Sequence, residues 1–461
     1  TFNIPRRWCG GAAGAAPGAS WSADSPRPGA SALEKSLLSK LAEIRLFNVH
    51  EHLIPEKERV AQTVDFFTLA GHYALNDVIS AGLQGDALAT VRNQEAPPEQ
   101  RWRAFEPHWN MARFTGYGQA LSIAIADIYG VREISANSIR KINAAIAAAN
   151  KPGLYDLILK GRARIGWCLV DPYWAPKPSP LDRDYFLLSQ RFDQFITPGS
   201  RKRLDALETI SGVSIASLAE LKKALAKTFE QAMRTGMAAV KSGLAYRRDL
   251  FFDDVSEHDA SADFDAMVKG GVEPPKGFRA QKERPFRRLE DHMFHQVARL
   301  AEAHGIPFQI HTGLLAGNSC LIENTNPTLL SNLFQLYPRL KFDLFHLGYP
   351  YQQELGVLAK LFPNVHADFC WAHMISPVAS RRTLDEYLEA VPVNKILGFG
   401  GDYRYPELTY AHARMARANI AQVLAGKVEA GLFREEQALE TGRLLLRDNA
   451  LRLFGGRAAA A

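Results

Sequence analysis

The stretch from Arg45 to Glu56, RLFNVHEHLIPE, ends an apolar run on two histidines that flank a glutamate. In an extended chain, side chains at positions i and i+2 share one face, so His50 and His52 reach a common point while Glu51 faces away. Two neutral imidazoles that converge form a chelating pair for zinc, iron, nickel or copper. Because short His-x-His pairs are common, the alternative is one core histidine beside one solvated histidine. The metal hypothesis therefore needs further ligands elsewhere in the chain.

Short apolar runs alternate with longer amphipathic stretches after this pair, and they are the elements that must position it. Most of the runs are apolar on both faces, as expected of parallel strands covered by helices. The eight predicted strands are Ile44–His50, Ala163–Val170, Arg191–Thr197, Gly236–Ser242, Ile306–Thr312, Lys341–Leu347, Asn364–Cys370 and Lys395–Asp402. This alternation predicts an α/β fold, a (β/α)8 TIM barrel, although an open doubly wound sheet would alternate in the same way.

Two regions exceed an ordinary barrel. A large helical insertion follows strand 1 at about 71–160, and an acidic, loop-like insertion at 247–277 separates the fourth strand from its helix. Residues 434–455 predict two C-terminal extra helices that close the barrel.

The ends of the chain are expected to lie outside the packed domain. Residues 1–32 are rich in Gly, Ala, Pro and Ser and predict a disordered or loosely docked leader, and 457–461 predict a flexible tail. The barrel domain is therefore expected to span 33–456.

Polar side chains recur at or near the C-terminal ends of the predicted strands, the rim where barrel enzymes build their active sites. They are His50 and His52 on the first strand, Lys241 on the fourth, His311 on the fifth, His346 on the sixth and Asp402 on the eighth. Chance would rarely place this set on those strand ends. We therefore predict that the six residues surround a metal site over the barrel mouth.

In this order of ligands the sequence resembles the amidohydrolase superfamily. That family places His-x-His on strand 1, often a lysine on strand 4, histidines on strands 5 and 6, and an aspartate on strand 8. The segments HEHLIPE and TLAGHYALNDVISAGL, with the helical insertion, look like its uronate isomerase branch. The segments NPTLLSNLF and FDLFHLGYP look like a branch whose substrates are mostly unassigned.

The resemblance implies one or two divalent ions, with zinc expected and manganese as the alternative. Lys241 stands where some members carry a carboxylated lysine that bridges two metals, whereas uronate isomerases look like a one-metal design. The alternative for Lys241 is an ammonium paired with Asp402 or with a substrate carboxylate, because an ammonium must lose its proton or be carbamylated before it binds a metal.

We assign the catalytic roles to Asp402, His346 and Lys241. A bound dication makes hydroxide available near neutral pH and polarises a carbonyl oxygen. Asp402 is placed to move a proton between the attacking water and the leaving group. His346 either binds a second metal or stabilises the developing oxyanion, since family members use it both ways.

Residues for substrate binding are predicted from position alone. Arg404 follows Asp402 by two and suits a substrate carboxylate if the strand extends that far. Trp371 and Tyr349 lie just past strand ends, and Trp109 and Arg113 in the insertion are candidates for a lid over the site. The alternative for Trp371 and Tyr349 is ordinary packing at the rim.

Composition excludes several other classes of function. The formal charge of +6 over 461 residues is modest, and the basic residues are scattered without aromatic interleaving, so we expect a small-molecule substrate and no nucleic acid partner. No apolar run is long enough to span a bilayer, so no membrane partner is expected. The four widely spaced cysteines fit a reducing cytoplasm, although N-terminal processing stays open. We also expect a homo-oligomer.

Three functions remain open from the sequence. The first is a metal-dependent hydrolase that cleaves an amide, a lactone or a similar C–N or C–O bond of a carboxylate-bearing substrate. The second is a uronate-isomerase-like sugar-acid isomerase, or a decarboxylase, on the same barrel. The third is a binding protein that kept the barrel without catalysis, which the intact ligand set argues against.

Overall fold

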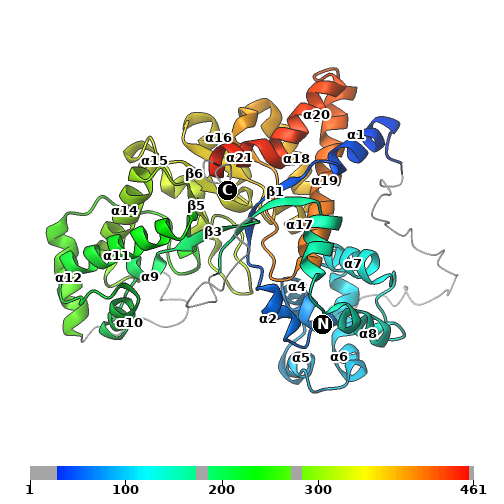
Figure 1. Cartoon of the computed structure of the whole chain (residues 1–461), viewed down its shortest axis with the longest axis horizontal. Coiled ribbons are helices and arrows are strands. Elements are labelled where there is room, and N and C mark those ends of the chain that lie inside the picture. Colours follow the sequence, from blue (N-terminus) through cyan, green and yellow to red (C-terminus); the bar gives the residue numbers. More distant parts are fainter. Residues whose placement is uncertain (1–28, 173–184, 271–282, 456–461) are drawn as a thin grey trace, which may run out of the picture.

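The computed structural model describes residues 29–172, 185–270 and 283–455. The predicted leader before residue 29 and the predicted tail after residue 455 lie outside this range. Within it, eight strands form one parallel sheet in chain order: β1 Leu46–Glu51, β2 Ile165–Val170, β3 Phe186–Arg191, β4 Met237–Ser242, β5 Phe308–Ile310, β6 Phe342–Leu344, β7 Val365–Asp368 and β8 Ile396–Leu397 (Figure 1).

Backbone hydrogen bonds between β1 and the segment after β8 bring the two ends of this sheet together. The amide of Val49 donates to the carbonyl of Phe399 at 3.2 Å, and the amide of Asp402 donates to the carbonyl of His50 at 3.0 Å. Parallel order and edge closure are the features of a (β/α)8 barrel, so the predicted fold class is confirmed. The segment that carries Asp402 consequently runs directly beside the His50–His52 pair.

Helices cover the outside of the barrel because their apolar residues recur at helical spacing. In α11 (Leu218–Arg234), Leu218, Leu221, Leu225 and Phe229 are buried, and Ser217 caps the first turn by accepting from the amide of Glu220. The other covering helices are α10 Arg201–Ser211, α12 Glu257–Lys269, α14 Arg287–Ala303, α15 Ser331–Leu336, α16 Gln352–Leu361, α18 Pro377–Ala390 and α19 Pro406–Glu429.

A helical layer lies between β1 and β2 in the sequence. It contains α2 Glu56–Val60, α3 Phe66–Ala70, α4 Ala74–Ser80, α5 Gly85–Arg92, α6 Pro98–Ala112, α7 Gly116–Tyr129, α8 Ile139–Ala149 and the π-helix η1 Asp156–Arg162. Figure 1 shows α4 to α8 gathered at one side of the barrel, next to α17 (Ala372–Ile375) and α19, and α7 packs against both of these helices. The terminal segment forms α20 Glu435–Arg443, the π-helix η7 Leu444–Asp448 and α21 Asn449–Phe454.

Two sequence predictions about elements are wrong. The third strand is Phe186–Arg191 rather than Arg191–Thr197, because Phe192, Phe195 and Ile196 follow the i, i+3, i+4 spacing of the short helix α9 (Asp193–Ile196). The insertion expected to be loop-like contains α12, which starts at an N-cap serine and buries apolar residues at helical spacing.

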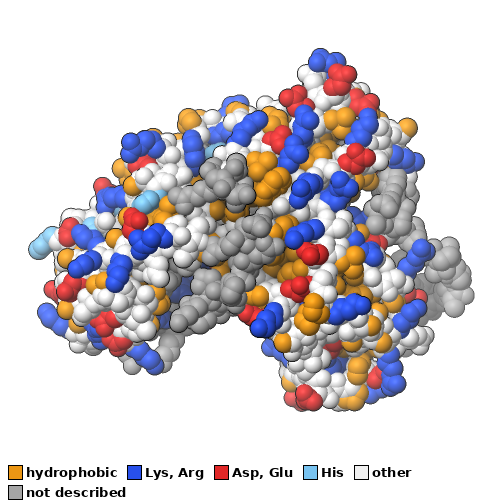
Figure 2. Space-filling view, in the orientation of Figure 1, with side chains coloured by type: hydrophobic (Ala, Val, Ile, Leu, Met, Phe, Trp, Pro, Cys, Tyr) orange, Lys and Arg blue, Asp and Glu red, His pale blue; other side chains and the backbone are white. Residues whose placement is uncertain are grey.

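Charge is spread over the surface rather than concentrated in one field. Lys and Arg side chains are interspersed with Asp and Glu over the face shown in Figure 2. Among the described residues, no helix has both the length and the apolar character needed to cross a membrane.

Candidate metal centre and active site

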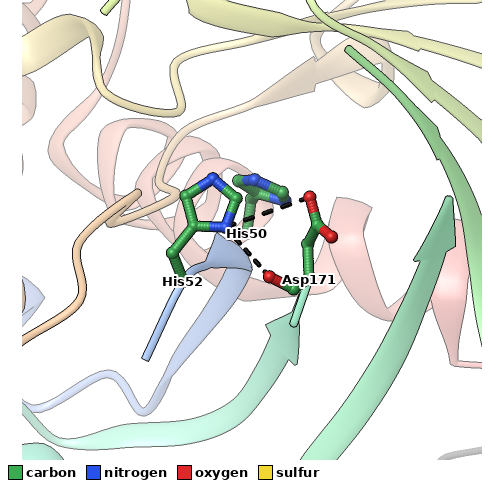
Figure 3. A group of neighbouring side chains, drawn as sticks. All are labelled: His50, His52 and Asp171. Atoms are coloured by element: carbon green, nitrogen blue, oxygen red, sulfur yellow. Dashed lines mark hydrogen bonds and ion pairs between the residues drawn. The ribbon is translucent and has the colours of Figure 1, made fainter. Parts of the chain in front are cut away.

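His50 and His52 meet Asp402 at the C-terminal mouth of the barrel. The Nε2 atoms of His50 and His52 lie 3.4 and 3.3 Å from the same carboxylate oxygen, Oδ1 of Asp402. The two imidazole centroids are 4.7 Å apart, so the rings converge as the i, i+2 spacing predicts. All three side chains are buried. Figure 3 shows the two histidines at the end of β1, beside Asp171 at the end of β2.

The environment of each histidine favours a neutral imidazole with a lone pair turned to the site. The Nδ1 atom of His52 lies 3.0 Å from the carbonyl oxygen of Asp171, which only accepts, so Nδ1 carries the proton and Nε2 keeps its lone pair for a metal. Burial, followed by the nearby Lys241 ammonium, lowers the pKa of His50 well below its usual value. Neither ring nitrogen of His50 has a hydrogen-bond partner in the described part of the chain.

His311 and His346 present two lone pairs to each other. The Nε2 atom of His311 lies 2.8 Å from the carbonyl oxygen of Leu314, and Nδ1 of His346 lies 2.9 Å from that of Cys370. Each ring therefore donates its proton to a carbonyl, which leaves Nδ1 of His311 and Nε2 of His346 as acceptors 3.2 Å apart. Two facing acceptors require a proton or a cation between or beside them.

Lys241 points into the barrel mouth and not into the helical layer. Its Nζ lies 3.3 Å from the ring centroid of Phe345, whose ring also contacts His50 and His346. The ammonium is buried and makes no hydrogen bond to any described residue. Burial, and then the charge of Arg191, lowers the pKa of Lys241 to about 8.

An aromatic wall closes the site on the side of the helical insertion. The hydroxyl of Tyr73 lies 2.7 Å from Oδ2 of Asp402 and donates to it. The ring of Tyr73 stacks on Trp371 at 4.6 Å and on Tyr117 at 5.3 Å, and Trp371 in turn meets the ring of His346 at 5.0 Å. Burial raises the pKa of Asp402 to about 7, against the opposing effect of the Tyr73 hydrogen bond.

The predicted substrate residues are not all brought to the site. Trp371 lies in the aromatic wall. Arg404 is half-buried and lies near His52. The pKa of His52 is held well below its usual value mainly by burial, then by the charge of Arg191, and more weakly by the charge of Arg404. Tyr349 is half-buried beside the backbone of Gly313, and its amide donates to the carbonyl oxygen of His346 at 3.0 Å. Within the described residues, no side-chain hydrogen bond or ring contact joins Tyr349 to the histidines.

The expected lid residues lie elsewhere in the insertion. The Trp109 ring packs against Phe105 at 5.8 Å and Phe66 at 6.4 Å, and Arg113 is exposed over the ring of Phe114 at 4.8 Å. The contact that the insertion makes with the site comes from Tyr73 and Tyr117 instead. Arg404 was predicted to share a face with Asp402 on an extended strand. That premise is wrong, because β8 ends at Leu397 and Asp402 adopts a left-handed φ of 62°.

Several residues at the site were missed from the sequence. The rings of His72 and Tyr73 lie tilted against each other with centroids 4.1 Å apart. The Asp171 carboxylate accepts a hydrogen bond from Nε of Arg191 and forms an ion pair with its guanidinium, while the Asp171 carbonyl orients His52. Asp171 follows β2 directly, so the strand-end rule that found Lys241 would have found it. Arg191 was not recognised because the third strand was predicted to begin at Arg191, whereas β3 ends there.

Within the described part of the chain, two groups of side chains have donor atoms close enough to hold a metal ion: His50, His52 and Asp171, and His346, Cys370 and Asp402. The ring nitrogens of His50 make no hydrogen bond to any described residue, and the acceptors of His311 and His346 face each other, so the residues present fit a divalent metal. Imidazole and carboxylate donors of this kind suit zinc and manganese alike.

Known proteins resemble the chain in sequence and in fold. Residues 217–456 match the model of the amidohydrolase family. Protein fluG of Emericella nidulans is 33% identical over 172 residues, which cover 36% of this chain and only 20% of that protein. A uronate isomerase of Nostoc punctiforme is 23% identical over 480 residues, covering 92% of this chain and 95% of its own length.

Among solved structures, a uronate isomerase of Thermotoga maritima superposes with a TM-score of 0.73 at 16% identity and covers 92% of this chain and 98% of its own. This likeness shows that the barrel and its insertion are shared.

Proposed function

The chain belongs to the amidohydrolase superfamily, and from that premise we propose that it is a metal-dependent enzyme that isomerises a small sugar acid of the uronate type. Hydrolysis, the hypothesis that the sequence favoured, is supported by the family match. Matches to uronate isomerases extend over 92% and 82% of the chain. They include the helical insertion, which lies outside the segment matched by the family model.

The observation that carries this proposal is the hydrogen bond from Tyr73, in the insertion, to the carboxylate of Asp402 on the barrel. An isomerase that shifts a carbonyl between adjacent carbons must remove a proton from one carbon and return a proton to the next. A carboxylate supplies the base, and a hydroxyl that donates to it keeps the accepted proton within reach of the same substrate. Asp402 and Tyr73 could therefore remove the proton and return it from the same side of the site.

His50, His52 and Asp402 would hold the metal, with zinc expected and manganese as the alternative. When bound, the ion supplies Lewis-acid polarisation of a substrate carbonyl or hydroxyl oxygen. The stacked rings of Tyr73, Tyr117 and Trp371 exclude water from the same volume. Arg404 is the cation that we assign to the carboxylate of the substrate.

A second candidate, hydrolysis of an amide or lactone, is favoured by Lys241 and by the facing lone pairs of His311 and His346. These three residues would complete a site for a second ion if Lys241 were carboxylated. In that case Asp402 would move a proton from water to the leaving group, and His346 would bind the second ion or stabilise an oxyanion.

Mass spectrometry of the product separates the two reactions. The purified, metal-loaded protein is incubated with a panel of hexuronates, lactones and N-acyl compounds in ordinary water and in D₂O. We expect a hexuronate product whose mass equals that of the substrate in ordinary water, with carbon-bound deuterium appearing in D₂O. A product that has gained the elements of water, with no turnover of any hexuronate, would show the hydrolase instead.

A further inference from the structure

Asn48 and Glu51 are polar residues buried inside the barrel wall on β1, where apolar side chains would be expected. The pairing of β1 with β2 is irregular between them, which brings two side chains three positions apart onto one side of the strand. Nδ2 of Asn48 donates to Oε1 of Glu51 at 2.7 Å. The two side chains therefore act as one hydrogen-bonded unit.

The remaining acceptor atoms of this unit hold the backbone on both sides of Asp402. Oδ1 of Asn48 accepts from the amide of Gly401 at 2.9 Å, and Oε2 of Glu51 accepts from the amide of Tyr403 at 2.7 Å. Asp402 itself lies between these two amides with a φ of 62°, a left-handed conformation that a residue with a side chain adopts at a cost. A Cβ at Gly401 would lie 1.7 Å from Oε1 of Glu51, so the approach is as close as glycine permits.

We propose that Asn48 and Glu51 form a bracket that positions Asp402, so that its carboxylate reaches His50, His52 and the hydroxyl of Tyr73 together. This role rests on the proposed function, since it concerns a ligand of the proposed metal. In this role neither residue is a ligand of the ion, and both act through the backbone of residues 401–403. Glu51, which stands between the two histidines in sequence, thus supports the site from behind although its side chain points away from the metal position.

The hydrogen bonds of the bracket make a sharp test possible. In Glu51→Gln, the single amide oxygen cannot accept from both Asn48 and Tyr403, and turning the Asn48 amide to compensate removes the acceptor for Gly401. In Asn48→Asp, two carboxylates face each other. In the double variant Asn48→Asp/Glu51→Gln, the new carboxylate accepts from Gly401 and from the new amide, whose oxygen accepts from Tyr403. All three hydrogen bonds and the total charge return.

The experiment titrates cobalt(II) into chelator-treated protein and records affinity, the visible d–d spectrum and the melting temperature. We expect each single variant to weaken cobalt affinity by about 10–100-fold and to change the spectrum, and the double variant to recover both. Glu407→Gln is the matched control, because Glu407 is a buried carboxylate paired with Arg59 away from the histidines. It should lower the melting temperature and leave the cobalt spectrum unchanged.

Several outcomes would overturn the bracket. One is a wild-type spectrum and affinity in both single variants, whatever their melting temperatures. Another is a folded double variant whose cobalt spectrum differs from that of the wild-type protein. This comparison of the double variant with the wild type tests the bracket even if the single variants fail to fold. Failure of the wild-type protein to bind cobalt would instead refute the proposed metal site, and the bracket with it.

Discussion

The hydroxyl of Tyr73 lies 2.7 Å from Oδ2 of Asp402 and 2.8 Å from the carbonyl oxygen of the same residue. Both residues have a positive φ, 77° for Tyr73 and 62° for Asp402, and such conformations cost about 1–3 kcal/mol each. The insertion and the barrel thus hold two strained residues in contact at the site. Strain of this kind persists only where the surrounding structure enforces it. For Tyr73 this is the stack with Tyr117 and Trp371, and for Asp402 it is the pair of hydrogen bonds to the amides on either side of it.

Tyr73→Phe removes this hydroxyl and keeps the aromatic stack. We expect kcat to fall by about 10²–10⁴-fold, the usual loss when a proton-transfer partner is removed, with metal content unchanged. Steady-state kinetics on the substrate found by the product screen measures the effect. The control is Tyr117→Phe, because the Tyr117 ring lies in the same stack while the hydroxyl bonded to Asp402 is that of Tyr73. Equal losses in the two variants would contradict a specific role for Tyr73.

His50→Ala and His52→Ala should each deplete the metal. Each change removes one of two imidazoles that converge on Oδ1 of Asp402, and two remaining ligands hold a divalent ion weakly. Elemental analysis of the purified variants measures the metal per chain. His295→Ala is a suitable control, because His295 is buried and bonded to Tyr337 in the helical layer. Full occupancy in both site variants would refute the ligand assignment.

The barrel could be predicted because its signal is repeated along the chain. Strands such as Ile165–Val170 and Met237–Ser242 fall inside the predicted runs, and five of the predicted runs contain the site candidates His50, Lys241, His311, His346 and Asp402. The candidate ligands at the ends of β1, β5 and β6 were therefore predicted from their place at a strand end, where the fold itself fixes their direction. The i, i+2 spacing of His50 and His52 needed no knowledge of the rest of the chain.

The contribution of the insertion could not be predicted in the same way. Tyr73 reaches Asp402 across 329 positions of sequence, and nothing in a helical segment shows which of its side chains will face the barrel. Trp109 was chosen as a lid residue for its type, yet its ring packs with Phe66 and Phe105. The position of Asp402 likewise depends on a left-handed loop after a two-residue strand, and alternation along a strand does not describe such a loop.

Lys241→Met distinguishes a site with one ion from a site with two. Methionine keeps the apolar contact with Phe345 and removes the nitrogen that would be carboxylated. If the isomerase proposal is right, the metal content per chain should stay at the wild-type value. Loss of about half of the metal, measured by elemental analysis, would support the two-ion hydrolase in which Lys241 bridges.

Arg404→Ala should mainly raise KM. A guanidinium that anchors a substrate carboxylate contributes equally to the ground state and the transition state, so its loss leaves kcat nearly unchanged. Arg414→Ala is the control, because Arg414 pairs with Asp127 in the helical layer. A fall in kcat without a change in KM would place Arg404 in the proton-transfer step instead.

Asp402→Asn should abolish turnover while preserving the fold and part of the metal binding. Asparagine tolerates positive φ better than most residues, so the loop held by the amides of Gly401 and Tyr403 has no added reason to move. Its amide oxygen still accepts from Tyr73 and binds a metal weakly, but it cannot take up a proton. We expect kcat to fall by at least about 10²–10⁴-fold.

Kinetics, elemental analysis and a thermal melt of the Asp402→Asn protein check this expectation together. Asp263→Asn provides the control, since Asp263 is a buried carboxylate bonded to Arg288 away from the barrel mouth. Wild-type-like turnover in Asp402→Asn would refute the assignment of Asp402 as the proton carrier. His346 and Lys241, the other catalytic candidates on the same rim, would then take its place, because both are buried beside the same Phe345 ring.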